Sequence, residues 1–204
     1  MGKITMFIII YGPEGSGKTT QGKLLAKKLN LPHLVSGDLV RKYAKEDSGI
    51  MGEICRNAIQ KGHYVADSEM FVLWKQRLKE KDVEKGFIID GFPRNMAQAL
   101  FLDDKLNKYG KCVSMVLYLK VREKVSIERL LKRGRRNPDG SLADSPENIR
   151  ERLRRYKLEE RDVLEFYKKK GVLKQIDGER SIEAIHEDVF AKAEQVKQDE
   201  NSKA

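Results

Sequence analysis

Apolar positions along this chain follow two alternating patterns. Short, nearly continuous apolar runs are typical of buried strands, and apolar residues recurring every three or four positions are typical of amphipathic helices. Strands that alternate with helices predict an α/β fold with a parallel sheet and helices on both of its faces. The strand-like runs are residues 4–11, 31–35, 86–90, 113–119 and 172–177. The helical stretches are residues 18–29, 39–46, 50–61, 68–79, 94–109, 123–133, 146–170 and 182–196.

Local signals refine the ends of several helices. Ser145 followed by Pro146 predicts a helix start, because serine caps helices and proline favours the first helical position. Gly171 is expected to end that helix in the left-handed conformation. Ser36 or Asp38 is expected to cap the helix after the second strand. The polar tail, residues 195–204, is expected to be frayed.

The first strand leads into the run Gly12-Pro13-Glu14-Gly15-Ser16-Gly17-Lys18-Thr19, which fits the pattern G-x-x-x-x-G-K-[ST]. Glycines at these positions let successive backbone N–H groups face an anion at the start of the next helix. Lys18 is expected to reach the β- and γ-phosphates, and the Thr19 hydroxyl is expected to bind Mg²⁺. The segment from Gly12 to Thr20 is therefore predicted to bind a nucleoside triphosphate.

Two further segments lie at predicted strand ends. The run Ile88-Ile89-Asp90-Gly91-Phe92-Pro93-Arg94 places a carboxylate where Mg²⁺ is held through water opposite such a loop. Gly91 and Pro93 predict a sharp turn that brings Arg94 over the same crevice. The run Ser36-Gly37-Asp38-Leu39-Val40-Arg41 follows the second strand. Because ligands collect at the carboxyl ends of parallel strands, Arg41 and Arg94 predict a second anion site.

The charge balance is strongly basic. The formal net charge is +10, and residues 120–136 hold eight basic side chains against two acidic ones. Such a cluster is typical of nucleic-acid binding or of a phosphate cage around a small ligand. Interleaved aromatic residues, which single-stranded nucleic acid would favour, do not accompany the cluster. Nucleic acid is therefore the less favoured partner.

Other function classes receive no support from the sequence. No cleavable signal peptide is evident at the N-terminus, and no apolar run approaches the ~20 residues that span a bilayer. Cys55 and Cys112 stand far apart, so neither a structural zinc site nor a disulfide framework is expected.

The loop after the first strand and the two strand-end segments resemble, in order and spacing, the adenylate kinase family of nucleoside monophosphate kinases. The resemblance extends from the first strand to about Val189. The resemblance implies a three-layer P-loop NTPase sandwich with a five-stranded parallel sheet, in one domain over residues 1–204. It implies a small acceptor-binding insertion at residues 36–65 and a short lid at residues 134–144. The implied activity is reversible, Mg²⁺-dependent phosphoryl transfer from ATP to AMP, by a cytoplasmic monomer.

The resemblance also implies roles for individual residues. Arg129 resembles the arginine that stacks on the ATP base, and Arg133 and Arg152 resemble the pair that neutralises the moving phosphoryl group. The predicted catalytic set comprises Lys18, Arg94, Arg133, Arg152 and a lid arginine, Arg136, whereas Arg129 belongs to the predicted ATP site. The predicted AMP site comprises Ser36, Gly37, Arg41, Val65, Gly91, Arg94, Gln98 and Arg152.

The predicted lid departs from the family pattern. The segment Asn137-Pro138-Asp139-Gly140 is strong turn chemistry, and Ser141 stands where short-lid members carry an arginine. We interpret residues 137–142 as an insertion and expect Arg135 or Arg136 to supply the missing guanidinium. Arg136 is taken as the candidate.

Acceptor choice is argued from two positions. Gln98 lies one helical turn after Arg94, and its carboxamide offers a donor and an acceptor for an adenine edge. Ser36 keeps a hydroxyl where adenylate kinases have threonine. AMP is therefore the favoured acceptor.

Two alternatives stay open. A UMP, CMP or thymidylate kinase of the same fold is one, since Lys18-Thr19-Thr20-Gln21 departs from the more usual Lys-Gly-Thr-Gln. A P-loop protein that binds RNA or a partner and uses nucleotide only as a switch is the other.

Overall fold

The computed structural model describes residues 5–137 and 139–201. Their strands form one parallel sheet in the order β2-β3-β1-β4-β5, which confirms the predicted fold class. The predicted first residue of the first strand, Ile4, lies outside the described part of the chain. The strands are β1 (Met6–Tyr11), β2 (His33–Val35), β3 (Gly86–Asp90), β4 (Met115–Lys120) and β5 (Leu173–Asp177).

The strand register aligns the ends that carry the motifs. Val35 of β2 and Ile10 of β1 are both paired with Asp90 of β3. On the other side of β1, Tyr11 is paired with Tyr118 of β4. The segments that follow β1, β2 and β3 therefore begin side by side at the carboxyl edge of the sheet.

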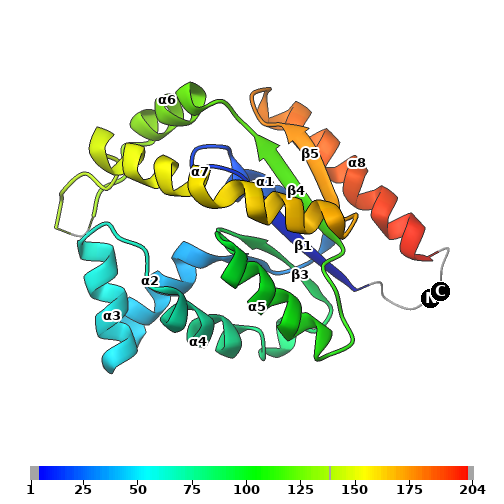
Figure 1. Ribbon diagram of the computed structural model, residues 1–204, viewed down its shortest axis with the longest axis horizontal. Coiled ribbons are helices and arrows are strands. Elements are labelled where there is room, and N and C mark those ends of the chain that lie inside the picture. Colours follow the sequence, from blue (N-terminus) through cyan, green and yellow to red (C-terminus); the bar gives the residue numbers. More distant parts are fainter. Residues whose placement is uncertain (1–4, 138, 202–204) are drawn as a thin grey trace.

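Helices cover both faces of this sheet (Figure 1). α1 and α8 lie on one face, and α4, α5 and α7 lie on the other. α2 and α3 pack against each other between β2 and α4, apart from α6 and α7. The helices are α1 (Lys18–Leu29), α2 (Ser36–Glu46), α3 (Ile50–Gln60), α4 (Asp67–Arg77), α5 (Met96–Asn107), α6 (Glu123–Arg133), α7 (Pro146–Lys169) and α8 (Ile182–Asn201), with a 3₁₀ turn η1 at Lys81–Val83.

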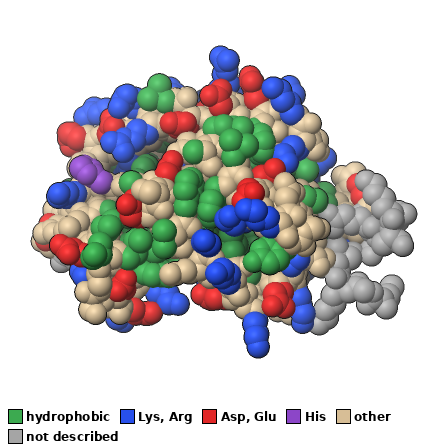
Figure 2. Space-filling view, turned by 60° about the horizontal axis from the view of Figure 1, so that its bottom comes forward, with side chains coloured by type: hydrophobic (Ala, Val, Ile, Leu, Met, Phe, Trp, Pro, Cys, Tyr) green, Lys and Arg blue, Asp and Glu red, His purple; other side chains and the backbone are tan. Residues whose placement is uncertain are grey.

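The surface that Figure 2 brings forward mixes side-chain types. Hydrophobic side chains lie in separate patches there, and basic and acidic side chains are intermingled between them. Large exposed apolar side chains include Ile50, Val72 and Leu100, which come from three different helices. Singly exposed apolar residues are ordinary on a protein surface and indicate no docking site by themselves.

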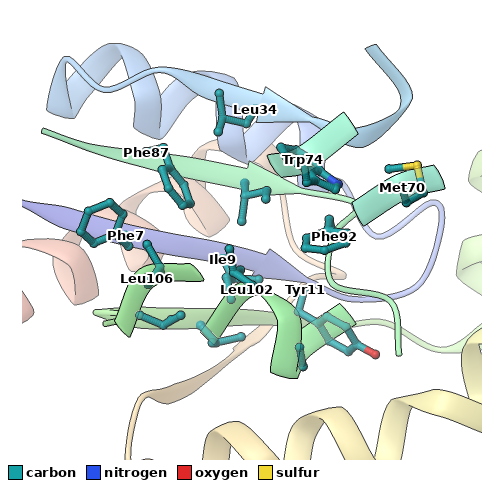
Figure 3. Close-up of a cluster of buried hydrophobic side chains, with 14 of the residues drawn as sticks. Phe7, Ile9, Tyr11, Leu34, Met70, Trp74, Phe87, Phe92, Leu102 and Leu106 are labelled. Atoms are coloured by element: carbon teal, nitrogen blue, oxygen red, sulfur yellow. The ribbon is translucent and has the colours of Figure 1, made fainter. Parts of the chain in front are cut away.

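The core has two halves because strand residues alternate between the faces of the sheet. Phe7, Ile9 and Tyr11 of β1 point to the α5 side, where Figure 3 shows Leu102 and Leu106 against them. On the other face, Met6, Ile8 and Ile10 pack with residues of α1 and α8. All six residues of β1 are buried, as expected for the central strand of a sheet covered on both faces.

Helix ends show where the sequence signals were sufficient. The Ser145 hydroxyl accepts the Asn148 N–H (3.2 Å) with Pro146 next to it, so the predicted cap is confirmed. After α7, Gly171 has φ 73°, and its N–H donates to the Lys168 carbonyl (2.9 Å), which confirms the predicted stop. Among the described residues, no helix is long and apolar enough to cross a membrane.

α1 and α6 have the predicted bounds, α3, α4 and α7 differ from the prediction by one or two residues, and three other helices differ for reasons that the structure shows. α2 starts at Ser36 with Val35 as its N-cap, so Asp38 lies in the first turn, where its charge favours the helix dipole. α5 starts at Met96 because the Asn95 side chain accepts the Gln98 N–H (2.9 Å) and caps the helix. α8 continues to Asn201 instead of fraying from residue 195, since Val196 packs on the core. Residues 202–204 of the predicted tail lie outside the described part.

Candidate functional site

The loop after β1 is held by its own lysine. The Lys18 ammonium donates to the carbonyls of Gly12 (2.9 Å) and Pro13 (2.8 Å), so its side chain folds back across the loop. Gly12 (φ 146°) and Gly15 (φ 83°) are required here, since a Cβ on either would come within 2.7 Å of a backbone oxygen of β4 or α6. Burial lowers the pKa of Lys18, while Asp90 and Glu14 oppose that shift.

At the start of α1, a hydroxyl and a carboxylate lie together. The Thr19 hydroxyl donates to the Asp90 carboxylate at 2.5 Å, and the Asp90 residue is only 2% exposed. The two oxygens fit Mg²⁺, which prefers oxygen ligands and is held in proteins by one or two carboxylates, substrate phosphates and water. Among residues 5–137 and 139–201 there is no cluster of three His, Cys, Asp or Glu side chains that could hold a metal without such a substrate.

Glu14 links the loop to both sides of the crevice. Its carboxylate accepts the Tyr64 hydroxyl (2.5 Å) and forms an ion pair with Arg152 of α7 (2.8 Å). Burial pushes the pKa of Glu14 upward, but the Arg152 guanidinium and the Tyr64 hydroxyl outweigh it, and the pKa ends below its ordinary value. The Glu14 side chain is therefore a partly buried anion before any nucleotide binds.

Arginines from α6, the lid and α7 meet at one carboxylate, Asp144. Arg133 binds it with two hydrogen bonds (2.8 and 2.9 Å), and Arg152 donates to it at 2.8 Å. Arg135 donates its backbone N–H (3.1 Å) and brings its guanidinium within 3.8 Å. Burial alone would raise the pKa of Asp144, but the hydrogen bonds from Arg133 and Arg152 lower it to about 2. We call Asp144 and its three arginines the lid cluster.

The two candidate lid arginines have different surroundings. The Arg135 side chain is 45% exposed, and its pKa is lowered by desolvation and by the neighbouring Arg133. Arg136 is exposed and donates to the Gly140 carbonyl (2.8 Å) within a hairpin in which Arg136 pairs with Leu142. Ser141 bonds within the same hairpin, to Asp139. The structure thus brings Arg135, and not Arg136, into the lid cluster; Pro138 of the predicted insertion lies outside the described residues.

Arg129, the predicted base-stacking residue, lies beside the loop. Its guanidinium donates to the Gly178 carbonyl after β5 (2.9 Å) and comes within 3.4 Å of the Gly15 carbonyl.

On the acceptor side, Arg94 is positioned by uncharged groups. Its guanidinium lies over the Tyr64 ring, 3.7 Å from the centroid, and Nε donates to the Gly91 carbonyl (2.9 Å). Gly91 in turn lies against Ser36, since a Cβ on Gly91 would come 3.3 Å from the Ser36 Cβ. The turn after Asp90 therefore places Arg94 beside Gly91 and Tyr64.

Two other predicted acceptor residues, Arg41 and Val65, and the predicted ATP-binding residue Thr20 differ in how far they are exposed. Arg41 pairs with Asp38 (2.5 Å) beside Gly37, and its side chain is 54% exposed. Val65 is buried and packs in the hydrophobic core, so only its backbone can serve a ligand. Thr20, at the end of the loop motif, is exposed.

Gln98 is buried and bonded at both ends of its carboxamide. Its Oε1 accepts the Arg94 backbone N–H (2.7 Å), and its Nε2 donates to Asp67 (2.6 Å). Asp67 also accepts Asn95 Nδ2 (2.7 Å). The sequence reasoning missed both Asp67 and Tyr64, because no local spacing relates them to partners about thirty residues or more away along the chain.

The comparisons agree with this geometry. A family model described as adenylate kinase matches residues 10–172. An adenylate kinase of Xanthomonas euvesicatoria is 36% identical over 182 residues, covering 89% of this chain and 96% of the relative. Adenylate kinase 1 of Synechocystis is 39% identical over 178 residues, with 87% and 91% covered. An adenylate kinase of Leuconostoc mesenteroides is 38% identical over 182 residues, with 89% and 94% covered.

Proposed function

Because the chain belongs to the adenylate kinase family of ATP-dependent nucleoside monophosphate kinases, we propose that it transfers the γ-phosphoryl group of ATP to AMP, giving two ADP. The observation that carries the proposal is the convergence of cationic side chains on one crevice. Glu14 of the loop pairs with Arg152 (2.8 Å) and accepts the Tyr64 hydroxyl (2.5 Å), and Arg94 lies over the ring of that tyrosine (3.7 Å). Such a cage suits two nucleotides that meet through their phosphates.

The donor side positions the triphosphate. The backbone N–H groups of the loop and the start of α1 receive the phosphates, and Lys18 leaves the carbonyls of Gly12 and Pro13 for phosphate oxygens. Arg129 stacks on the base beside Gly15. Thr19 and Asp90 are the residues that would hold Mg²⁺, and the ion would neutralise charge on the substrate phosphates.

Transfer needs charge neutralisation and little covalent work from the protein. The attacking group is a phosphate oxygen of AMP, so the chain supplies no nucleophile. Arg133, Arg135 and Arg152 of the lid cluster surround the moving phosphoryl group, because guanidinium groups stay charged and bind phosphate oxygens in pairs. Closure of the lid excludes water, which would otherwise hydrolyse ATP.

The acceptor side binds AMP by its two ends. Arg41 and Arg94 take its phosphate, and Gln98 reads the edge of its base. Ser36, Gly37, Val65 and Gly91 form the backbone wall between them, within an acceptor-binding insertion at residues 36–65. A monomeric state and a cytoplasmic location stay predictions from the sequence.

A coupled assay tests the proposal. Phosphoryl transfer from MgATP is measured with AMP, UMP, CMP and dTMP at equal concentrations, and each kcat/KM is compared. We expect AMP to be the best acceptor and activity to vanish when EDTA removes Mg²⁺. A higher kcat/KM for any pyrimidine nucleotide contradicts the acceptor assignment, and no acceptor-dependent ADP formation contradicts the transfer reaction itself.

A salt series tests the nucleotide-switch alternative. Binding to RNA by a basic surface falls steeply with ionic strength, because it releases counterions. We expect any RNA retention to be lost by physiological salt. Tight retention at that salt would favour the switch.

A further inference from the structure

Asp67 begins α4 and lies 31 residues before Gln98 in the sequence. In the fold the two side chains are hydrogen-bonded to each other. The Asp67 carboxylate accepts Gln98 Nε2 at 2.6 Å and Asn95 Nδ2 at 2.7 Å. Asn95 cannot turn over, since its Oδ1 accepts the Gln98 backbone N–H and caps α5. Asp67 therefore meets two donors, one with each of its oxygens.

These contacts fix the direction of the Gln98 carboxamide. A carboxylate only accepts hydrogen bonds, so the Gln98 NH₂ group must face Asp67. A backbone N–H only donates, so Oε1 must face Arg94, where the distance is 2.7 Å. A flipped carboxamide would set oxygen against carboxylate and N–H against N–H. An amide has two N–H donors and two lone pairs, so these contacts leave one N–H and one lone pair of the carboxamide unused.

The direction of the carboxamide matters because adenine and guanine present hydrogen-bond donor and acceptor in opposite order. On the Watson–Crick edge, adenine presents the N6 amino donor beside the N1 acceptor, whereas guanine presents the O6 acceptor beside the N1–H donor. A carboxamide in one orientation pairs with adenine, and the same carboxamide turned over pairs with guanine. A glutamine that was free to turn would bind either purine.

We propose that Asp67 is a positioning residue that selects adenine over guanine by holding the Gln98 carboxamide in one orientation. Asp67 acts through Gln98 and does not itself touch the nucleotide. The inference rests on the proposed function, because it concerns the base of the acceptor bound at that site. The charged Asp67 carboxylate thus orients the Gln98 carboxamide, which in turn binds the uncharged edge of the base.

The test is Asp67→Asn, which keeps the size of the side chain and removes its acceptor-only character. Asparagine has one oxygen where aspartate has two, so it cannot accept from Gln98 and Asn95 in the observed geometry. Gln98 then keeps only the Arg94 N–H as a contact that fixes its direction, and the carboxamide turns over more easily. We measure kcat/KM with AMP and with GMP, and the Kd of each by calorimetry. The ratio of AMP to GMP should fall about tenfold or more, the scale of one hydrogen bond to a charged group, while KM for ATP is unchanged.

A double-mutant cycle separates positioning from general support of the fold. In a Gln98→Ala background the carboxamide is absent, so Asp67→Asn should leave the AMP to GMP ratio unchanged. Asp104→Asn, an exposed carboxylate on α5 paired with Lys105 and Lys108, is the matched control and should leave all constants unchanged. Asp67→Ala is the second variant if Asp67→Asn does not fold.

Two results overturn the inference. One is an equal loss with AMP and GMP, so that the ratio stays at the wild-type value. The other is the same fall in ratio with and without Gln98. The proposed function is judged separately, since AMP turnover by the unmodified enzyme is measured first and does not depend on Asp67.

Discussion

The two sides of the crevice hold their arginines by different means. In the lid cluster, three guanidinium groups gather at the buried carboxylate of Asp144, and Glu14 pairs with one of them. On the acceptor side, Arg94 rests on an aromatic ring and a carbonyl oxygen, and Arg41 stays exposed with Asp38.

Charge density explains the difference. Three guanidinium groups a few ångströms apart repel one another strongly at low dielectric, so carboxylates must assemble them before the phosphates arrive. A single arginine needs only orientation, which the Tyr64 ring supplies without adding an anion that would compete with phosphate. The transfer side is thus pre-assembled by charge, and the acceptor side by shape and hydrogen bonding.

The largest effect is expected at Lys18, which lies between the two sides. Lys18→Met removes the ammonium at the β- and γ-phosphates, and a comparable cationic contact is worth roughly 10³–10⁵ in rate. We expect phosphoryl transfer to fall by that order while circular dichroism stays native. Lys23→Met, on the same helix, is the matched control. Near-normal turnover in Lys18→Met would contradict the assignment of Lys18 to the phosphates between the two sets of arginines.

Arg135→Ala is expected to come next. It takes one guanidinium from the lid cluster, and loss of one preorganised charge-stabilising group costs about 10²–10³ in kcat. The loss should fall on kcat more than on KM for AMP, as for a contact made mainly in the transition state. Arg136→Ala and Ser141→Ala are the controls, since both side chains bond within the hairpin. A loss in Arg136→Ala with full activity in Arg135→Ala would reverse the assignment.

The sequence was sufficient wherever a single local signal decides the structure. The strand, turn and helix around Lys18 carry the loop. The predicted α1 and α6 match the observed bounds, and they end at Asn30 and Gly134, both in the left-handed conformation. The position of the motifs at the carboxyl edge of the sheet could be predicted from the alternation of strands and helices. These features depend on neighbours in the chain.

What the sequence left open depends on partners that are distant in the chain. Arg135 and Arg136 are adjacent and of one type, and only the hairpin decides which one turns inward. Asp67 and Tyr64 have ordinary polar contexts, and their roles come from contacts with α5 and with the loop. α8 extends beyond residue 195 because Val196 packs against the core, and local helix propensity does not reveal such a contact.

A pH series sharpens the comparison through Asp144. Its pKa falls from an ordinary 3.8 to about 2 in the fold, so its stabilising effect is complete above pH 4 and is lost as the pH falls from about 4 to 2. The amount is about 2 kcal/mol of unfolding free energy. Wild type should therefore be more stable than Asp144→Asn at neutral pH, and the difference should shrink by that amount toward pH 2.

Urea unfolding at each pH measures this difference. Asp162→Asn, an exposed carboxylate on α7, controls for the loss of one surface charge and should stay within about 0.5 kcal/mol of wild type. A gap between wild type and Asp144→Asn that does not change with pH would mean that Asp144 supports the lid by packing and not by charge.

The smallest effect on stability is expected from Arg41→Ala, on the acceptor side. The side chain is 54% exposed and its ion pair with Asp38 is solvated, so its loss should change the unfolding free energy by no more than about 1 kcal/mol. Binding should suffer instead: loss of a guanidinium contact to the AMP phosphate should raise KM for AMP about tenfold with kcat largely kept. Lys42→Ala removes the same charge from the next position of α2 and should leave KM for AMP unchanged. An Arg41→Ala variant that loses stability as strongly as Asp144→Asn would show that both sides of the crevice are assembled by charge, and the contrast between them would fail.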